Sequence, residues 1–223
     1  MKIPKIDELF DLSHTAAAEW LARFSYPYEA LSHIREMIDT IGTGLSPEEY
    51  DEIAPKVWVS RQATVSPTAY LGPYTIVGHG TEIRHCAFVR GDALIGEGVV
   101  VGNSTEIKNA ILFDGVQVPH YNYVGDSILG YRAHMGAGSI ASNFRSDKGN
   151  IAIRSDEERI ESGRRKLGAM LGDFAEVGCN SVLCPGCVVG RRSIVYPLSR
   201  VRGTLPEDSI LKGDGSIVAR KSN

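Results

Sequence analysis

Several features that define common protein classes are scarce or absent in this sequence. Four cysteines among 223 residues are too few for a disulfide-stabilised scaffold. No run of about 18 apolar residues occurs, and the opening residues, MKIPKIDELFDLSH, lack the apolar core of a secretory signal peptide. The net charge of −3 gives no reason to expect nucleic acid or an anionic membrane as a partner. We therefore expect a cytoplasmic protein of one domain, with at most a small appendage.

What the sequence does contain is a repeat of six residues. An aliphatic residue recurs at every sixth position from Val59 to Ile107 and again from Leu171 to Val201. The fifth residue of each hexad is small, and glycine is frequent at the second position. Neither an α-helix, with a period of about 3.6, nor a flat strand, with a period of about 2, has this periodicity. The pattern predicts an all-β fold, a parallel β-helix of hexapeptide repeats, with glycine where the chain turns a corner.

The repeat also assigns the cysteines. Cys184 and Cys187 form a C-x-x-C, but a structural zinc site usually needs four ligands. Cys187 falls on a small, interior position of the hexad, so we expect a core residue there and no metal site.

Segments outside the repeat define the expected domain organisation. Residues 1–56 are predicted to form a helical cap packed on the first coil, with helices in HTAAAEWLARF, PYEALSHIREMIDTIG and LSPEEYDEIA, the last with Ser46 as N-cap. Residues 57–210 form the β-helix, and residues 211–223 form a C-terminal tail. Residues 141–169 interrupt the repeat as a charged loop excursion, in which Ile151 and Ile153 predict a short hairpin.

The repeat loses one residue at two places, between Ile107 and Leu112 and between Val124 and Leu129. Three hexads make one triangular coil, so the register can be followed through both places. It predicts two interior stacks on adjacent faces, Ile83–Val101–Val118 and Val89–Ile107–Val124.

The same register brings unusual polar residues together. Arg90 and Lys108 occupy equal positions on adjacent coils, where like charges at about 5 Å repel each other. We interpret the pair as an anion site, such as one for a phosphate, in preference to two cations that point apart. His120 stacks with His85 and Asn103 on the preceding face, and Tyr123 lies near the corner that leads to the cations.

With these residues in place, the chain resembles a known family. HYNYVGDSILGYRAHMGAGSIASNF and SGRRKLGAMLGD are similar to segments of the acetyltransferase domain of bacterial and archaeal bifunctional N-acetylglucosamine-1-phosphate uridylyltransferases. The resemblance covers roughly residues 77–210. It implies a left-handed β-helix, a homotrimer with sites between neighbouring β-helices, and acetyl transfer from acetyl-coenzyme A to the amine of an amino-sugar 1-phosphate.

The resemblance also implies residue roles. His120 matches the general base, and a neutral imidazole can accept the proton of the attacking amine near pH 7. The expected substrate-binding residues are Arg90, Lys108, Tyr123, His134 and Lys148, and those expected on the coenzyme A side are Asn143, Phe144 and Cys179. His134 stands where the family has an asparagine, and Phe144 replaces a tyrosine. Lys148 and Lys166 both lie in the loop excursion, where the family has a lysine. These departures concern the acceptor more than the reaction type.

The nucleotidylyltransferase half of that family would bring a Rossmann-like domain, which we do not expect in this sequence. A name such as UDP-N-acetylglucosamine pyrophosphorylase would describe that half, so nucleotide transfer is not expected.

Two other functions fit parts of the sequence. FVRGDALIGEG resembles a coil of γ-type carbonic anhydrases, whose zinc ligands are three histidines. In the predicted register His85 and His120 share a face, but His134 ends a hexad on a different one. The second is a non-catalytic trimeric scaffold or sensor that binds sugar phosphates.

Overall fold

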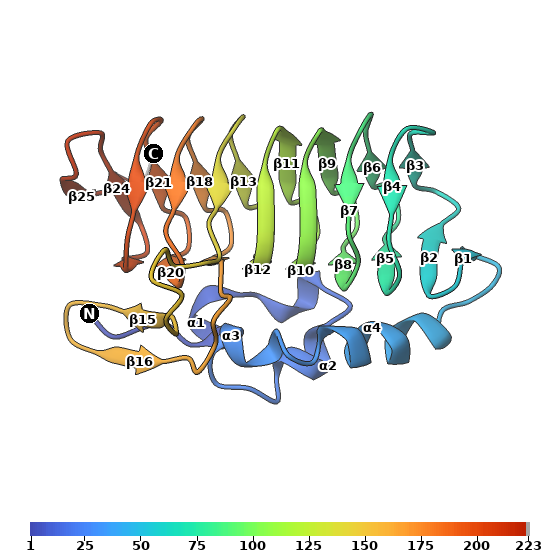
Figure 1. Ribbon diagram of the computed structural model, residues 1–223, viewed down its shortest axis with the longest axis horizontal. Coiled ribbons are helices and arrows are strands. Elements are labelled where there is room, and N and C mark those ends of the chain that lie inside the picture. The colour runs from blue at the N-terminus through green and yellow to red at the C-terminus, as the bar shows by residue number, and fades with distance from the viewer. Residues whose placement is uncertain (222–223) are drawn as a thin grey trace.

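A left-handed parallel β-helix dominates the computed structural model, which describes residues 1–221 (Figure 1). In Figure 1 the chain descends on the near side, rises on the far side and advances from right to left, which is a left-handed coil. The predicted fold class is confirmed.

The strands of the β-helix lie on three faces. The first face contains β4 (Tyr70–Leu71), β7 (Phe88–Val89), β10 (Glu106–Leu112), β12 (Tyr123–Leu129), β14 (Ile140–Ala141), β19 (Val182–Leu183) and β22 (Arg200–Val201). The second contains β2 (Val57–Ser60), β5 (Thr75–Val77), β8 (Ala93–Ile95), the later parts of β10 and β12, β17 (Ala169–Leu171), β20 (Cys187–Val189) and β23 (Thr204–Leu205). The third contains β3 (Thr64–Val65), β6 (Glu82–Ile83), β9 (Val100–Asn103), β11 (Gln117–His120), β13 (His134–Met135), β18 (Glu176–Val177), β21 (Ile194–Val195) and β24 (Ser209–Leu211).

The predicted register is confirmed on both faces. Val101 pairs with Ile83 and Val118 on the third face, and Ile107 pairs with Val89 and Val124 on the first. These side chains are almost completely buried and fill the interior. The small fifth residues also point inward, and buried hydroxyls among them bond to backbone carbonyls, as Thr105 Oγ1 does to Val118 O at 3.0 Å.

The two shortened hexads change one corner of the β-helix. Elsewhere the first and second faces are separate short strands, but β10 and β12 run through the corner as continuous strands of 7 residues. Their mutual pairing joins the two faces into one sheet. Removing one residue therefore tightens the corner and keeps the interior register.

Most corners have a residue in the left-handed backbone region, but not at the glycine position that we predicted. Left-handed φ angles fall at the fourth hexad position, as at Tyr74 (56°), Cys86 (57°) and Ser104 (54°). At the second position the glycines keep ordinary φ angles and lie against the neighbouring coil. A Cβ added at Gly72 would lie 2.3 Å from the carbonyl oxygen of Arg90. Glycine is needed there because coils approach too closely for a side chain.

The N-terminal segment contains the helical elements α1 (Ile6–Leu9), η1 (Leu12–His14), α2 (Ala18–Leu21), α3 (Pro27–Ala30) and α4 (Ile34–Thr43). In α4, Ile34, Met37 and Ile38 are buried at helical spacing. No helix within residues 1–221 has both the length and the apolar character to cross a bilayer.

We predicted that these helices cap the first coil. In the structure they lie along one side of the β-helix instead (Figure 1). The helix α4 contacts β5, β8 and β10, and α3 contacts β12. The start of the segment contacts later coils. The backbone N–H of Asp11 donates to the buried Asp173 carboxylate at 2.7 Å, and the rings of Phe10 and Phe113 lie 5.0 Å apart. The apolar face of the segment is buried against several coils at once.

Antiparallel strands cover both ends of the β-helix. At the start, β1 (Tyr50–Ala54) pairs with β2, so LSPEEYDEIA ends in a strand and the helix predicted there is wrong. At the other end, β25 (Ile217–Ala219) pairs with β24. Both pairings protect edges that could otherwise bind another strand.

The excursion forms the predicted hairpin, in which β15 (Ala152–Arg154) pairs with β16 (Arg159–Glu161). The division of the chain at residues 56 and 210 remains a prediction, and residues 222 and 223 of the expected tail lie outside the described residues.

The close approach of the coils can be tested at Gly102. A Cβ at this position would lie 1.5 Å from the carbonyl oxygen of Pro119. We expect Gly102→Ala to lower the free energy of unfolding by about 3 kcal/mol or more, because the backbone must move. Gly213→Ala is the control, since nothing lies within 4 Å of its added Cβ. Urea unfolding measures both, and equal midpoints for the two variants would contradict the explanation.

Candidate functional site

The residues singled out in the sequence fall into three groups in the structure. Lys108, Tyr123 and Asn143 meet at the tightened corner between the first and second faces, with Arg90 beside them. His120, His134 and Cys179 lie on the third face, and Lys148 and Phe144 lie in the arm. The arm is residues 142–168, which connect β14 to β17.

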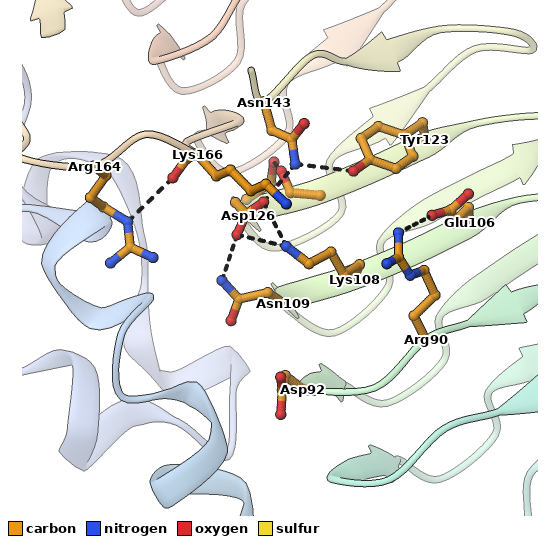
Figure 2. Close-up of polar contacts among 12 residues, drawn as sticks. Arg90, Asp92, Glu106, Lys108, Asn109, Tyr123, Asp126, Asn143, Arg164 and Lys166 are labelled. Carbon is orange, nitrogen blue, oxygen red and sulfur yellow. Dashed lines mark hydrogen bonds and ion pairs between the residues drawn. The ribbon is translucent and has the colours of Figure 1, made fainter. Parts of the chain in front are cut away.

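The first group is part of a larger hydrogen-bonded set, which we call the corner cluster: Lys108, Asn109, Tyr123, Asp126 and Asn143 (Figure 2). Lys108 Nζ lies 3.1 and 3.2 Å from the two Asp126 carboxylate oxygens. Asn109 Nδ2 donates to Asp126 Oδ1 at 2.8 Å, and Asn143 Nδ2 donates to Asp126 Oδ2 at 2.6 Å. The same Asn143 nitrogen lies 3.0 Å from the Tyr123 hydroxyl oxygen. One carboxylate therefore connects its own coil to side chains of the preceding and the following coil.

Asp126 is the centre of the corner cluster, and our sequence analysis did not identify it. Its side chain is only 4% exposed, so the carboxylate depends on its protein partners for solvation. Asp126 (φ 51°) and Asn109 (φ 47°) both occupy the left-handed corner position of a shortened hexad. Asp and Asn tolerate this conformation better than other non-glycine residues. The sequence signal that could have identified Asp126 was the pair Asn109 and Asp126, which occupy matching positions of two consecutive shortened hexads.

Glycines leave room for these contacts. A Cβ at Gly125 would lie 2.4 Å from the Tyr123 hydroxyl oxygen and 2.9 Å from Asn143 Nδ2. A Cβ at Gly168 would lie 2.1 Å from Ser127 Oγ, and the Gly168 N–H donates to the Asp126 carbonyl at 2.8 Å. The second glycine therefore anchors the end of the arm directly on the corner cluster.

The environment of Tyr123 favours its neutral form. Burial raises the pKa of the Tyr123 hydroxyl, and the hydrogen bond from Asn143 acts in the opposite direction. The carboxylates of Asp126 and Glu106 add to the upward shift. Tyr123 is therefore a phenol that can donate a hydrogen bond at neutral pH.

The two predicted phosphate-binding cations each have a carboxylate partner. Arg90 Nη1 lies 2.9 Å from Glu106 Oε1, and this bond raises the pKa of the guanidinium. Lys108 is paired with Asp126, as described above. The repulsion between Arg90 and Lys108, which suggested an anion site, is thus offset by two carboxylates of the same chain. The two cations are not unpaired, and their role in binding phosphate remains a prediction.

His120 lies on the third face, around one corner from the corner cluster. Its backbone N–H donates to Asn122 Oδ1, and its exposed imidazole has no hydrogen-bond partner within residues 1–221. The buried Asn122 holds the turn between the two faces through bonds to Gly136 O and Ser139. His120 and Tyr123 are thus joined by a turn that the Asn122 hydrogen bonds hold, and no hydrogen bond joins their side chains within residues 1–221.

The other predicted residues of the third face are separate from His120. His134 Nδ1 lies 2.8 Å from Glu176 Oε2, and both side chains border a cavity of about 480 Å³ together with Arg132 and Gln117. The thiol of Cys179 is exposed. Their roles as substrate and coenzyme A contacts remain predictions.

The arm brings one candidate lysine to the corner cluster. Lys166 is exposed and its side chain extends beside Asp126 and Asn143 in Figure 2. The bridge between Phe144 and Lys166, and the bond from Leu167 N to Asn143 O at 3.0 Å, close the base of the arm. Lys148 lies in the exposed turn of the arm, away from this base.

No ligand set for a metal ion exists among His, Cys, Asp and Glu side chains within the described residues. The face predicted for His134 is wrong, because β13 pairs with β11 and places His134 on the same face as His120. His85 Nδ1 nevertheless bonds to Thr68 Oγ1 at 2.7 Å and His134 to Glu176, and the three histidines of the carbonic-anhydrase alternative form no ligand set within the described residues. Cys187 is fully buried in the interior, as predicted, and burial raises the pKa of its thiol.

Comparison with known proteins identifies relatives of the kind that the sequence suggested. No family model matches the chain. The chain is 32% identical over 131 residues to the bifunctional sugar-1-phosphate nucleotidylyltransferase/acetyltransferase of Sulfurisphaera tokodaii, covering 59% of this chain and 28% of that protein. It is 29% identical over 161 residues to the bifunctional protein GlmU of Methanococcus vannielii, covering 72% of this chain and 34% of that protein. The resemblance is confirmed, and the chain spans about a third of the length of these relatives or less.

Solved structures with a similar fold are more distant. The acetyltransferase domain of PglB from Neisseria gonorrhoeae is 14% identical, with a TM-score of 0.33 over 83% of this chain and 64% of that one. The N-acyltransferase AntD from Bacillus cereus is 19% identical, with a TM-score of 0.38 over 79% and 90% of the two chains. At these scores the likeness supports no inference about function.

The corner cluster predicts a large stability cost for Asp126→Asn. The amide would place an NH₂ group against the donors of Asn109 or Asn143 and would leave Lys108 without a counter-charge. We expect a loss of about 3 kcal/mol in the free energy of unfolding, measured by urea titration. The control is Asp51→Asn, which breaks the exposed pair with Arg61 and should cost less than about 1 kcal/mol. Similar losses in the two variants would show that Asp126 has no special importance.

The raised pKa of Tyr123 predicts a dependence of stability on alkaline pH. Above the ordinary tyrosine pKa of 10.0, the unfolded chain loses the hydroxyl proton while the folded chain keeps it. The contribution of Tyr123 to stability is thus complete below that pH and decreases as pH rises toward the pKa of the folded state. The stability difference between wild type and Tyr123→Phe, measured by urea unfolding, should be constant up to about pH 9 and should shrink above about pH 10. An unchanged difference would contradict the burial of the hydroxyl.

Proposed function

We propose that this protein is an acetyl-coenzyme A-dependent N-acetyltransferase that acts on an amino-sugar 1-phosphate. The observation that supports this most is the 32% identity to the S. tokodaii protein, whose name includes acetyltransferase. The corner cluster is consistent with it, because three residues matched to substrate and coenzyme A contacts lie within one hydrogen-bonded set.

The reaction would proceed by direct transfer. The neutral amine of the sugar forms the new N–C bond at the acetyl carbonyl carbon, and the C–S bond to coenzyme A then breaks, with the electron pair leaving on sulfur. The proton lost by the amine passes to the His120 imidazole and then to the thiolate. A backbone N–H at a coil corner would stabilise the oxyanion between these steps. No cysteine takes part.

The geometry suits this role for His120. A general base must be able to accept a proton, and the His120 imidazole is exposed and not engaged by another side chain within residues 1–221. The turn held by the hydrogen bonds of Asn122 sets its position relative to Tyr123, whose neutral hydroxyl can donate to a sugar oxygen. His120 and the corner cluster lie on different faces of one chain, so the proposal includes a site completed between neighbouring β-helices of a homotrimer.

The phosphate of the acceptor would lie near Arg90 and Lys108. Arg90 and Glu106 are both partly exposed, so a phosphate can replace the carboxylate as the partner of the guanidinium. Lys108 is held more firmly, because its partner Asp126 is buried. Arg90 is therefore the more available of the two cations. A cytoplasmic location belongs to the same proposal.

A second function is a trimeric protein that binds sugar phosphates without turnover. The observation in its favour is that His120 has no carboxylate or carbonyl partner that orients the imidazole within the described residues. Binding of glucosamine-1-phosphate without release of coenzyme A thiol would support this alternative.

The proposed reaction is tested by thiol release from acetyl-coenzyme A with glucosamine-1-phosphate and galactosamine-1-phosphate. We expect turnover by the wild type and a decrease in kcat of ~10²-fold or more in His120→Ala. The matched control is His85→Ala, which removes another exposed histidine of the third face, and it should retain activity. Equal activity of His120→Ala and wild type would remove His120 from the mechanism, and no turnover with either acceptor would contradict the proposed substrate class.

A further inference from the structure

The arm forms one wall of a cavity that the proposed reaction does not explain. We call this cavity, of about 470 Å³, the arm cleft. Its walls are the arm residues 142–154, the turn at residues 184–186 and the turn at residues 200–203. In Figure 1 the hairpin of β15 and β16 stands out from the β-helix beside β20. A volume of this size falls in the range of small-molecule sites, about 300 to 1,000 Å³.

Positive charge is concentrated in the arm cleft. Four arginines line it: Arg145, Arg154, Arg200 and Arg202. Asp147 is the only acidic residue among the lining residues within the described chain, and Arg145 binds it through both carboxylate oxygens. Arg154, Arg200 and Arg202 have no carboxylate within ion-pair distance in residues 1–221. Three guanidinium groups therefore share one cavity without a counter-charge.

The cleft also has an apolar side. Phe144 is 41% exposed, and Pro185 and Ala152 line the cavity with it. A planar ring can pack on such a surface, while guanidinium groups bind phosphate oxygens through paired hydrogen bonds. Phosphates attached to a nucleoside satisfy both requirements.

The arm cleft adjoins the corner cluster through three consecutive residues. Ser142 and Phe144 line the cleft, while Asn143 between them directs its side-chain nitrogen to Tyr123 and Asp126. The alternation follows from the extended backbone at the end of β14. A ligand with its phosphates in the cleft could thus place its other end near Tyr123.

We propose that the arm cleft binds the phosphate groups of a nucleotide ligand. The 3′-phospho-ADP part of coenzyme A and the diphosphate of a nucleotide sugar share this chemistry. The assignment of the ligand as coenzyme A rests on the proposed transfer reaction. The phosphate site itself rests on the arginines and the apolar side of the cleft.

The test is calorimetric titration of the full chain with coenzyme A, dephospho-coenzyme A and UDP-N-acetylglucosamine. We expect Arg154→Gln/Arg202→Gln to weaken binding of the preferred nucleotide by about tenfold to about a hundredfold, since each lost phosphate contact costs up to about tenfold. Arg165→Gln is the control, because Arg165 is an exposed arm arginine that does not line the cleft. Unchanged urea midpoints would establish that the variants remain folded.

The three ligands separate the two sources. Weaker binding of coenzyme A, with dephospho-coenzyme A less affected by the substitutions, supports the coenzyme A phosphates as occupants. Weaker binding confined to UDP-N-acetylglucosamine supports a nucleotide-sugar site. The proposal is overturned if the wild type binds none of the three, if the double variant binds as the wild type does, or if Arg165→Gln weakens binding as much.

Because binding and thiol release are measured separately, the two proposals can fail independently. Arginine-dependent binding without turnover would leave the cleft in place and remove the transferase function. Turnover with nucleotide binding unaffected by the arginine substitutions would support the transferase function and overturn the arm cleft as the nucleotide site.

Discussion

The close stacking of successive coils is the constraint on which the rest of this structure depends. Neighbouring strands in a sheet lie about 4.8 Å apart, so the interior and the tightest contacts between coils restrict side-chain size. The first position fills the interior with an aliphatic residue, and the second allows no Cβ where coils touch, as at Gly72 and Gly102. The fourth takes a left-handed backbone so that the chain can turn. Because the stack repeats, one misplaced side chain disturbs two coils.

The corner cluster shows how such a rigid stack can include a polar site. Deleting one residue from each of two consecutive coils keeps Ile107 and Val124 in register, and it turns Asn109 and Asp126 into a tightened corner. The buried Asp126 carboxylate then accepts hydrogen bonds from residues on the preceding and the following coil. A carboxylate with so many charged and neutral donors is stable when buried, and it fixes the side chains around it.

The arm connects this cluster to a cavity of different character. Its base is closed by contacts at Asn143, Phe144 and Gly168, while its hairpin extends away from the coils. Negative charge is buried at the corner cluster, and positive charge is exposed in the arm cleft a few residues away. A ligand that spans both would contact an ordered polar surface at one end and a guanidinium-rich surface at the other.

The six-residue period by itself determined the β-helix, its interior stacks and the place of the excursion, because these follow from spacing along the chain. It also brought Arg90 next to Lys108 and identified His120 and Tyr123 as neighbours of one corner. The tertiary structure decided the rest: the pairing of both cations, the burial of Asp126, the helices along one side, and the arm cleft. Arg145 and Arg202 meet there although 57 positions separate them in the sequence (202 − 145). Contacts of this kind depend on how the arm and the N-terminal segment pack on the coils, and no periodicity records that packing.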